Sequence, residues 1–256
     1  MIIALVGGLG NQMFQYAMGR ARSLRENRPV SFDTSYYPAQ SLRTYALSVF
    51  QAPIKIASPL AVFIAKARQK ILGNPDAYLE GYWQSENYFQ DYADTIRADF
   101  TLKNPLGNEA QKILADIRSS NAASLHIRRG DYAASAKVQA VHGLIPLSYY
   151  ADAIAYIAEH RDNPTFFVFS DDILWAKENL TSTHPLVFVS RKGIADYEEL
   201  ALMSSCNDNI LANSSFSWWG AWLNPHKEKI VIAPHHWFAD NSKSTADLIP
   251  QSWIQL

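Results

Sequence analysis

The hydrophobic positions of this chain form short apolar runs that alternate with longer stretches of helical periodicity. The apolar runs predict buried strands, and they cover residues 2–6, 30–33, 122–125, 165–169, 186–189, 209–212 and 230–233. The stretches between them predict helices, which lie around residues 14–24, 109–117, 150–158, 175, 196–199 and 218–222. Asp196 and Glu199 are arranged like a capping box at the start of one of these helices. Regular alternation of strand and helix predicts parallel sheets with helices on both faces.

The alternation divides the chain into two α/β units, which we predict at residues 1–120 and 121–256, without a low-complexity linker. The composition, 48% hydrophobic and 18% charged, is that of a globular protein, and the net charge of -1 lacks the basic excess that nucleic-acid binding requires. The single cysteine, Cys206, excludes an internal disulfide and fits a reducing compartment. The run at 2–6 has no basic residues before it and glycines after it, unlike a signal peptide. No apolar run reaches membrane-spanning length, so we expect a cytoplasmic protein.

The glycine-rich segment 7–12 joins the first predicted strand to the first helix. Gly8 and Gly10 match two glycines of a dinucleotide-binding fingerprint, but Met13 occupies the third position. A nicotinamide-dependent oxidoreductase is therefore an alternative function that this element supports only in part. The narrower prediction is a glycine turn that presents backbone N–H groups of a helix N-terminus to an anion or a sugar.

The segment 126–131 combines an imidazole, two guanidinium groups and a carboxylate at the end of a predicted strand. Alternation along the strand places His126 and Arg128 on one side and Arg129 on the other. We expect Gly130 to let the backbone turn, and Asp131 to return toward the arginines. Such charges are unfavourable to bury without a charged ligand, and a guanidinium fork suits a phosphate. The alternative is an Arg–Asp ion pair that only closes the loop.

Two further polar segments follow predicted strands. Asp171 and Asp172 come directly after one strand and could bind a metal ion, accept hydrogen bonds from a base or ribose, or cap the next helix. The DxD spacing of metal-dependent sugar transferases is absent, so we expect no metal here. The segment 213–219 follows another strand and opens a helix, which brings hydroxyl and N–H groups to the positive end of a helix dipole. Because parallel strands end at the same edge of a sheet, a diphosphate could bind between this helix and Arg128.

Residues 34–75 contain no Asp or Glu but include five cations, and 58–70 has the pattern of an amphipathic helix. One interpretation of the basic segment 55–72 is peripheral contact with the inner face of an anionic membrane or with a lipid-linked glycan. The other is a helix packed on the core with a solvated basic edge. The aromatic and amide cluster at 82–88 either stacks on sugar rings or belongs to the core.

Four segments of the chain resemble, in order, the motifs of the glycosyltransferase family 11 α-1,2-fucosyltransferases. They are 7–16 (GGLGNQMFQY), 126–131 (HIRRGD), 170–172 (SDD) and 213–222 (NSSFSWWGAW). The His-x-Arg-Arg-x-Asp element is also similar to that of α-1,6- and protein O-fucosyltransferases. The resemblance implies a GT-B-like fold, with two Rossmann-like α/β domains and a cleft between them. It also implies GDP-fucose as the donor substrate, no cofactor or metal, and inversion at the anomeric carbon.

By this resemblance, domain 1–120 faces the acceptor and carries the glycine turn, and domain 121–256 binds GDP-fucose. Arg128 is expected to hold the β-phosphate. The other predicted donor-binding residues are Gly8, Leu9, Gly10, Asn11, His126, Asp171, Asp172, Asn213, Ser214, Ser215 and Phe216. The expected acceptor is a galactose-terminated oligosaccharide, whose 2-hydroxyl receives the fucose during cell-surface glycan synthesis.

The base that deprotonates the acceptor is less well defined by sequence. The glutamate that follows the motif in related α-1,6 enzymes is absent here, where alanines and a serine follow Tyr132. Asp131 is the first candidate, although pairing with an arginine would lower its pKa and its basicity. His142 is the second, since imidazole titrates near neutral pH. A fucosyltransferase of another linkage and a non-catalytic glycan-binding protein are further alternatives.

Overall fold

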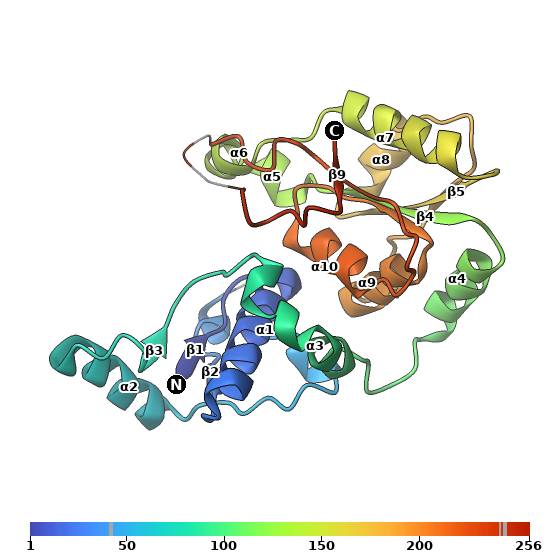
Figure 1. The fold of residues 1–256 in the computed structure, drawn as a ribbon. Helices are drawn as coiled ribbons and strands as arrows, with labels where there is room; N and C mark the ends of the chain where they lie inside the picture. Colours follow the sequence, from blue (N-terminus) through green and yellow to red (C-terminus); the bar gives the residue numbers. More distant parts are fainter. Residues whose placement is uncertain (41–42, 241, 243–244) are drawn as a thin grey trace. The chain divides into compact units, whose positions relative to one another are not determined.

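The computed structural model of the protein describes residues 1–40, 43–240, 242 and 245–256. The chain forms two compact units, Met1–Pro105 and Leu106–Leu256 (Figure 1). The division lies before the predicted boundary at 120, because helix α4 (Asn108–Arg118) buries Ala110, Ile113 and Ile117 in the core of the second unit.

The first unit is built on a short three-stranded parallel sheet of order β2-β1-β3. Its strands are β1 (Ile2–Ala4), β2 (Ser31–Asp33) and β3 (Tyr78–Leu79), and its helices are α1 (Leu9–Glu26), α2 (Pro59–Leu72) and α3 (Ala93–Asp99). Four short 3-10 helices complete the described connections: Tyr37–Ala39, Leu47–Val49, Glu86–Tyr88 and Gln90–Tyr92. Strand β3 is too short to be recognised from periodicity, and it was not predicted.

Alternation along β1 places helices on both faces of this sheet. Ile2 and Ala4 point to the face covered by α2, whereas Ile3 points to α1. A Cβ on Gly19 of α1 would collide with the Ile3 side chain, so glycine allows the helix to lie close to the strand. In a dinucleotide-binding fingerprint the third glycine allows close packing of helix and strand. Met13 occupies that position here, and Gly19 allows the close packing instead.

The second unit contains a six-stranded parallel sheet of order β6-β5-β4-β7-β8-β9. Its strands are β4 (Ala122–Ile127), β5 (Thr165–Ser170), β6 (Leu186–Phe188), β7 (Asp208–Ile210), β8 (Val231–Ala233) and β9 (Ile254–Gln255). Besides α4, its helices are α5 (Gly130–Ala134), α6 (Ala136–His142), α7 (Leu147–His160), α8 (Ile173–Asn179), α9 (Asp196–Ser205) and α10 (Ser215–Leu223). Numbered within the unit, this is the strand order 3-2-1-4-5-6 of a doubly wound nucleotide-binding sheet. The predicted Rossmann-like fold of this half is therefore confirmed.

Side-chain alternation separates the core of the second unit into two apolar layers. Leu125 and Val168 point to the layer formed with α7 and α8. Phe167 and Phe169 point to the layer formed with α4 and α9. Helix α9 begins one residue earlier than a capping box with Asp196 as N-cap requires, because Ala195 is its N-cap. Its N–H donates to Glu198 over 2.9 Å, so Glu198 takes the role predicted for Glu199.

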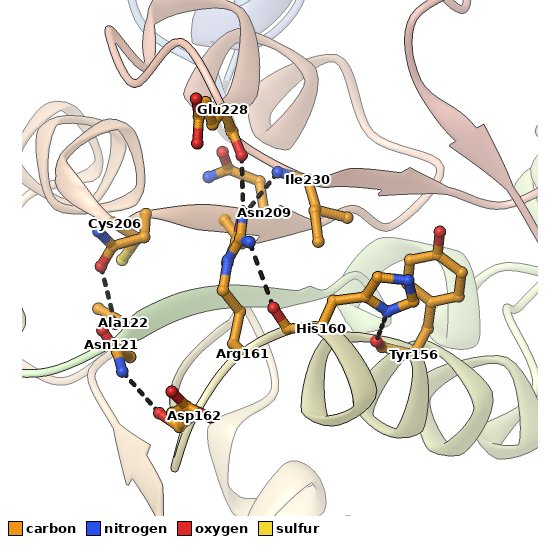
Figure 2. A network of polar contacts seen from close by, with 12 residues as sticks. Asn121, Ala122, Tyr156, His160, Arg161, Asp162, Cys206, Asn209, Glu228 and Ile230 are labelled. Atoms are coloured by element: carbon orange, nitrogen blue, oxygen red, sulfur yellow. Dashed lines mark hydrogen bonds and ion pairs between the residues drawn. The ribbon is translucent and has the colours of Figure 1, made fainter.

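The amino edge of the same sheet is closed by a network of paired polar groups. Figure 2 shows Arg161, which follows α7, donating to the carbonyl oxygens of His160 and Glu228 over 3.3 and 2.7 Å. The same guanidinium binds both carboxylate oxygens of Asp208, at 2.8 and 2.9 Å, and Asp208 also accepts from the N–H of Ile230. The buried carboxylate thus ties β7 and β8 to the end of α7.

Candidate active site

The predicted site residues of the second unit meet at the carboxyl edge of its sheet. Ile127 at the end of β4 pairs with Ser170 at the end of β5, and Leu125 pairs with Ile210 of β7. The segments 128–131, 171–172 and 213–215 therefore leave the sheet at one edge. Strand order reverses between β4 and β7, and such a switch point is where open α/β sheets bind ligands.

Arg128 is held at this edge by Asp171. Its Nη1 lies 2.9 Å from Oδ2 of Asp171, and the other carboxylate oxygen accepts from the N–H of Arg129 over 2.8 Å. The acid of this ion pair follows the neighbouring strand β5. The predicted return of Asp131 toward the arginines concerns a side chain outside the described residues and stays a prediction. Asp171 thus orients the arginine through a charge-assisted hydrogen bond.

Gly130 serves a steric role rather than the conformational one predicted for it. Its φ lies outside the left-handed region, so the turn itself does not require glycine. A Cβ at this position would lie 2.5 Å from Oδ2 of Asp171. The glycine leaves room for the carboxylate that holds Arg128.

Arg129 faces the other side of the strand, as alternation predicted, and packs on α8. Its guanidinium carbon lies 3.8 Å from the ring centroid of Trp175, and its Nε lies 3.8 Å from Asp172. Asp172 also caps α8 by accepting from the N–H of Trp175 over 3.3 Å. The interpretation of Asp172 as a helix cap is therefore confirmed, while its predicted part in donor binding stays a prediction.

His126 is buried at the end of β4 and is neutral. Burial and the nearby Arg128 cation lower its pKa to about 3, against the raising effect of Asp171. Its ring lies 5.7 Å from the ring of Phe216, which belongs to the first turn of α10. Nδ1 of His126 has no hydrogen-bond partner among the described residues. A neutral, buried imidazole can exchange a hydrogen bond with a ligand but adds no positive charge for a phosphate.

The first turn of α10 provides hydroxyl and N–H groups near this histidine. Ser214 is the N-cap and accepts from the N–H of Phe216 over 3.3 Å. Asn213 is buried and donates to the carbonyl oxygens of His142 and Trp237, whereas its own Oδ1 has no partner among the described residues. No acidic residue lies in the first turn of the helix, so its dipole is available to an anion. The tryptophans of the same motif are buried and form core.

The two predicted base candidates lie on the short helices that follow β4. The ring of His142, the last residue of α6, stacks on Tyr132 at 4.7 Å and lies 5.7 Å from Phe238. The Tyr132 hydroxyl donates to the carbonyl oxygen of Asn213 over 3.3 Å, which ties these helices to the start of α10. The backbone of Asp131 belongs to α5, but its side chain lies outside the described residues. Both assignments stay predictions.

Glu199 is a carboxylate of this edge that sequence analysis assigned only to a helix cap. It lies in the first turn of α9, and its carboxylate hydrogen-bonds to the Ser190 hydroxyl. That hydroxyl accepts from the N–H of Ser170 at the end of β5. Burial, with smaller contributions from Asp196 and Asp171, raises the pKa of Glu199 to about 7. Only the tertiary environment gives this carboxyl a pKa near neutrality.

In the first unit, the glycine turn is shorter than predicted. Gly7 has a φ of +81°, Gly8 is the N-cap of α1, and the helix starts at Leu9, so Gly10 and Asn11 lie in its first turn. The helix cap uses no side chain, and the first turn carries no acidic residue. The expected helix N-terminus is present, and the side chain of Arg43 lies beside Gly8.

The amides that follow the turn hold the first unit together. Buried Gln15 accepts from the N–H of Val6 over 2.9 Å and donates to the carbonyl oxygen of Gly81 over 3.1 Å. Gln84 donates to Oδ1 of Asn11 over 2.8 Å. The aromatic cluster at 82–88 therefore lies beside the glycine turn.

Members of that cluster differ in exposure. Tyr82 and Tyr88 are exposed, and Trp83 is partly buried. Trp83 has a φ of +46°, an unfavourable backbone conformation for a bulky residue that commonly marks functional sites. Tyr82 and Tyr88 therefore present the exposed rings that stacking on a sugar requires.

Asp33 ends β2, the position where a dinucleotide-binding fold has its ribose-binding acid, but its environment does not suit that role. It is 4% exposed, and its carboxylate accepts from the hydroxyl of Tyr78 over 2.7 Å and from the N–H of Ser35 over 2.9 Å. With both oxygens engaged, this acid is not free for a nicotinamide dinucleotide.

Two other features of the described residues bear on ligands. They contain no group of three or more His, Cys, Asp or Glu side chains placed to hold a metal ion. A cavity of about 460 Å³ opens at the amino edge of the second sheet, lined by Asn121, Arg161, Asn207, His226, Lys227, Glu228 and Lys229. Because Arg161 is fully paired there, we assign this cavity no part in the candidate site.

Comparison with known proteins finds a glycosyltransferase family model and glycosyltransferase relatives. The sequence model described as "Glycosyl transferase family 11" matches residues 63–256. The chain is 34% identical to an "Alpha-1,2-colitosyltransferase" of Escherichia coli, covering 100% of this chain and 98% of the relative. It is 32% identical to "O-antigen biosynthesis glycosyltransferase WbnK" of the same species, covering 100% of both.

More distant similarities extend to animal and structurally characterised enzymes. A "Galactoside alpha-(1,2)-fucosyltransferase 1" of Ateles belzebuth is 26% identical over 85% of this chain and 63% of the relative. Among solved structures, the NodZ α-1,6-fucosyltransferase soaked with GDP-fucose superposes with a TM-score of 0.50 at 11% identity, over 88% of this chain and 92% of that one. At this identity the superposition bears on the fold alone.

Proposed function

Because the chain belongs to glycosyltransferase family 11, we propose that it transfers L-fucose from GDP-β-L-fucose to the 2-hydroxyl of a terminal galactoside. Its fold is of the GT-B type, with two α/β units built on parallel sheets. We assign donor binding to the unit Leu106–Leu256, which has the nucleotide-binding strand order, and the acceptor to the unit Met1–Pro105.

The observation that carries the proposal is the guanidinium of Arg128, held by Asp171 at the same sheet edge as the start of α10. As the bond between the anomeric carbon and the β-phosphate oxygen breaks, negative charge develops on the departing GDP. The Arg128 fork and the N–H groups behind Ser214 and Ser215 are suited to stabilise that charge without a metal ion. Because both are oriented before the reaction, little reorganisation is needed.

The remaining residues support binding and proton transfer. Neutral His126 offers a hydrogen bond to the nucleotide through its unpartnered Nδ1. The acceptor hydroxyl attacks the anomeric carbon from the face opposite the phosphate, which inverts the configuration. Its proton passes to a base, for which Asp131 and His142 are the candidates. The glycine turn of α1, with Arg43 beside it, and the exposed ring of Tyr82 are the proposed contacts of the first unit.

The test is a panel of galactoside-terminated acceptors incubated with GDP-fucose, with and without EDTA, followed by linkage determination by NMR. We expect an α-1,2-linked fucoside and equal rates in both conditions. GDP-colitose is a parallel donor, since a relative carries the name of a colitosyltransferase. A preference for GDP-colitose would change the proposed donor sugar from fucose to colitose but would leave the proposed α-1,2 linkage unchanged. Consumption of neither donor with any acceptor would support a binding protein instead, and loss of activity in EDTA would reject the metal-independent step.

A further inference from the structure

Helix α2 carries an apolar stripe that faces away from the unit to which it belongs. The helix is anchored through Val62 and Ala65, which pack on Ile2 and Ala4 of β1. On the other side, Leu60, Phe63 and Ile71 are 67%, 71% and 77% exposed, and Ile64 is 42% exposed. Figure 1 shows α2 at the edge of the first unit, beside β3.

The exposed positions form one continuous stripe. At about 100° per residue, positions 60, 63, 64, 67 and 71 lie on one side of a helix and positions 62 and 65 on the opposite side. A helix on the surface of a globular protein normally has a single apolar stripe, which faces the core. Here a second stripe of large side chains faces solvent, and contiguous exposed apolar surface usually marks an interaction site.

Basic residues flank the exposed stripe on both sides. On the same helical projection, Lys66 and Lys70 border one side and Arg68 borders the other. All three are exposed, and Lys66 also lies 4.5 Å from the ring centroid of Tyr78. No acidic residue occurs in the sequence from 34 to 75, so the segment presents positive charge only.

The helix is capped at both ends, so it does not depend on burial of the stripe. The Ser58 hydroxyl accepts from the N–H of Ala61 over 3.2 Å, Pro59 occupies the first position, and Gly73 ends the helix with a φ of +62°. These are strong start and stop signals. At 14 residues, α2 is too short to span a bilayer, and no helix among the described residues is long and apolar enough to do so.

We infer that α2 binds in the plane of an anionic phospholipid bilayer, with Leu60, Phe63 and Ile71 entering the acyl boundary and Arg68 and Lys70 at the headgroups. Apolar insertion with flanking cations is the arrangement of interfacial helices that recognise anionic lipid. Charge complementarity favours this partner over a second copy of the chain, because two basic stripes would repel each other. The inference adopts the membrane interpretation of the basic segment 55–72, for a helix that also packs on the core through Val62 and Ala65.

The first experiment is co-sedimentation of the full chain with vesicles of phosphatidylcholine, with and without phosphatidylglycerol. We expect binding only to the anionic vesicles, and we expect added salt to weaken it. Phe63→Ser/Ile71→Ser and Arg68→Gln/Lys70→Gln should each reduce the bound fraction roughly tenfold or more. Leu174→Ser, at a 70% exposed position of α8, and Lys112→Gln are the matched controls and should bind like the wild type. Thermal unfolding of every variant verifies folding.

A second experiment locates the insertion. Cys206 is fully buried, so an environment-sensitive fluorophore attached to a Phe63→Cys variant labels α2 alone. Its emission should shift to the blue on addition of anionic vesicles, whereas a label at Leu174→Cys should not respond. Wild-type binding by the α2 variants, or an unchanged emission at position 63, would overturn the inference. It would equally be overturned by a dimer in light scattering that Phe63→Ser/Ile71→Ser dissociates, without vesicle binding.

Discussion

Asp171, the first residue after β5, holds the guanidinium of Arg128, which comes from the neighbouring strand β4, at 2.9 Å. The same carboxylate accepts from the N–H of Arg129. A single acid therefore fixes both the backbone of the loop after β4 and the orientation of the Arg128 side chain. An arginine at a ligand site is useful only when its planar group already points at the ligand, because reorientation during the reaction reduces stabilisation of the transition state. The pair therefore joins the fold to the proposed chemistry.

Replacing Arg128 with lysine should remove most of the turnover. The positive charge remains, but a lysine cannot form two parallel hydrogen bonds to a phosphate or keep the same contact with Asp171. We expect kcat/KM to fall on the order of 10²-fold, as when one preorganised donor is lost. Arg191→Lys, at an exposed pair with Glu109, is the control and should retain activity. An Arg128→Lys enzyme with near-wild-type turnover would contradict the assignment.

Replacing Gly130 with alanine should reduce activity by displacing Asp171, not by straining the backbone. The added Cβ would meet the carboxylate oxygen that binds Arg128. We expect a loss of about tenfold or more in kcat/KM, with a nearly unchanged melting temperature. The check is a double-mutant cycle. In an Asp171→Ala background, Gly130→Ala should have little further effect, because the oxygen it displaces is gone. Additive losses would show that Gly130 acts by another route.

Glu199 should make the stability of the second unit depend on pH. Burial raises its pKa from 4.5 to about 7, so the folded chain binds more protons than the unfolded chain between these values. The free energy of unfolding should therefore fall as pH rises through this window. Glu199→Gln should be more stable than the wild type at about pH 8, by roughly 1–3 kcal/mol, and similar to it near pH 4.5. Urea unfolding across this range measures the difference, and the exposed Glu178→Gln is the control. A difference in the free energy of unfolding that does not change with pH would contradict a raised pKa for Glu199.

Replacing Arg161 with alanine should destabilise the second unit without touching the proposed site. Asp208 has a side chain that is only 2% exposed, and the substitution would leave its carboxylate without its cation. We expect a loss of about 3 kcal/mol, because an unpaired buried charge is strongly unfavourable. Arg191→Ala removes an exposed pair and should change stability by less than about 1 kcal/mol. Equal effects of the two substitutions in urea unfolding would show that burial does not strengthen the Asp208 pair.

The sequence by itself determined the longer strands and helices of this fold and the places where its polar segments lie. Apolar runs such as 122–125 and 165–169 are local signals, and they became β4 and β5. Strands of a parallel sheet end at one edge, so the positions of Arg128 and Ser214 near that edge followed from the alternation alone. The signals for α2 are local as well, since Ser58, Pro59 and Gly73 need no distant partner.

The tertiary structure decided which of these groups meet. Strand β4 lies between β5 and β7, and this order brings Asp171 to Arg128 and places Phe216 beside His126. Periodicity along the chain contains no information about strand order. Burial likewise depends on distant residues, which is why the neutral His126 and the raised pKa of Glu199 could not be predicted from sequence. Local chemistry specifies helices and strands, whereas partners and protonation states depend on contacts that exist only after folding.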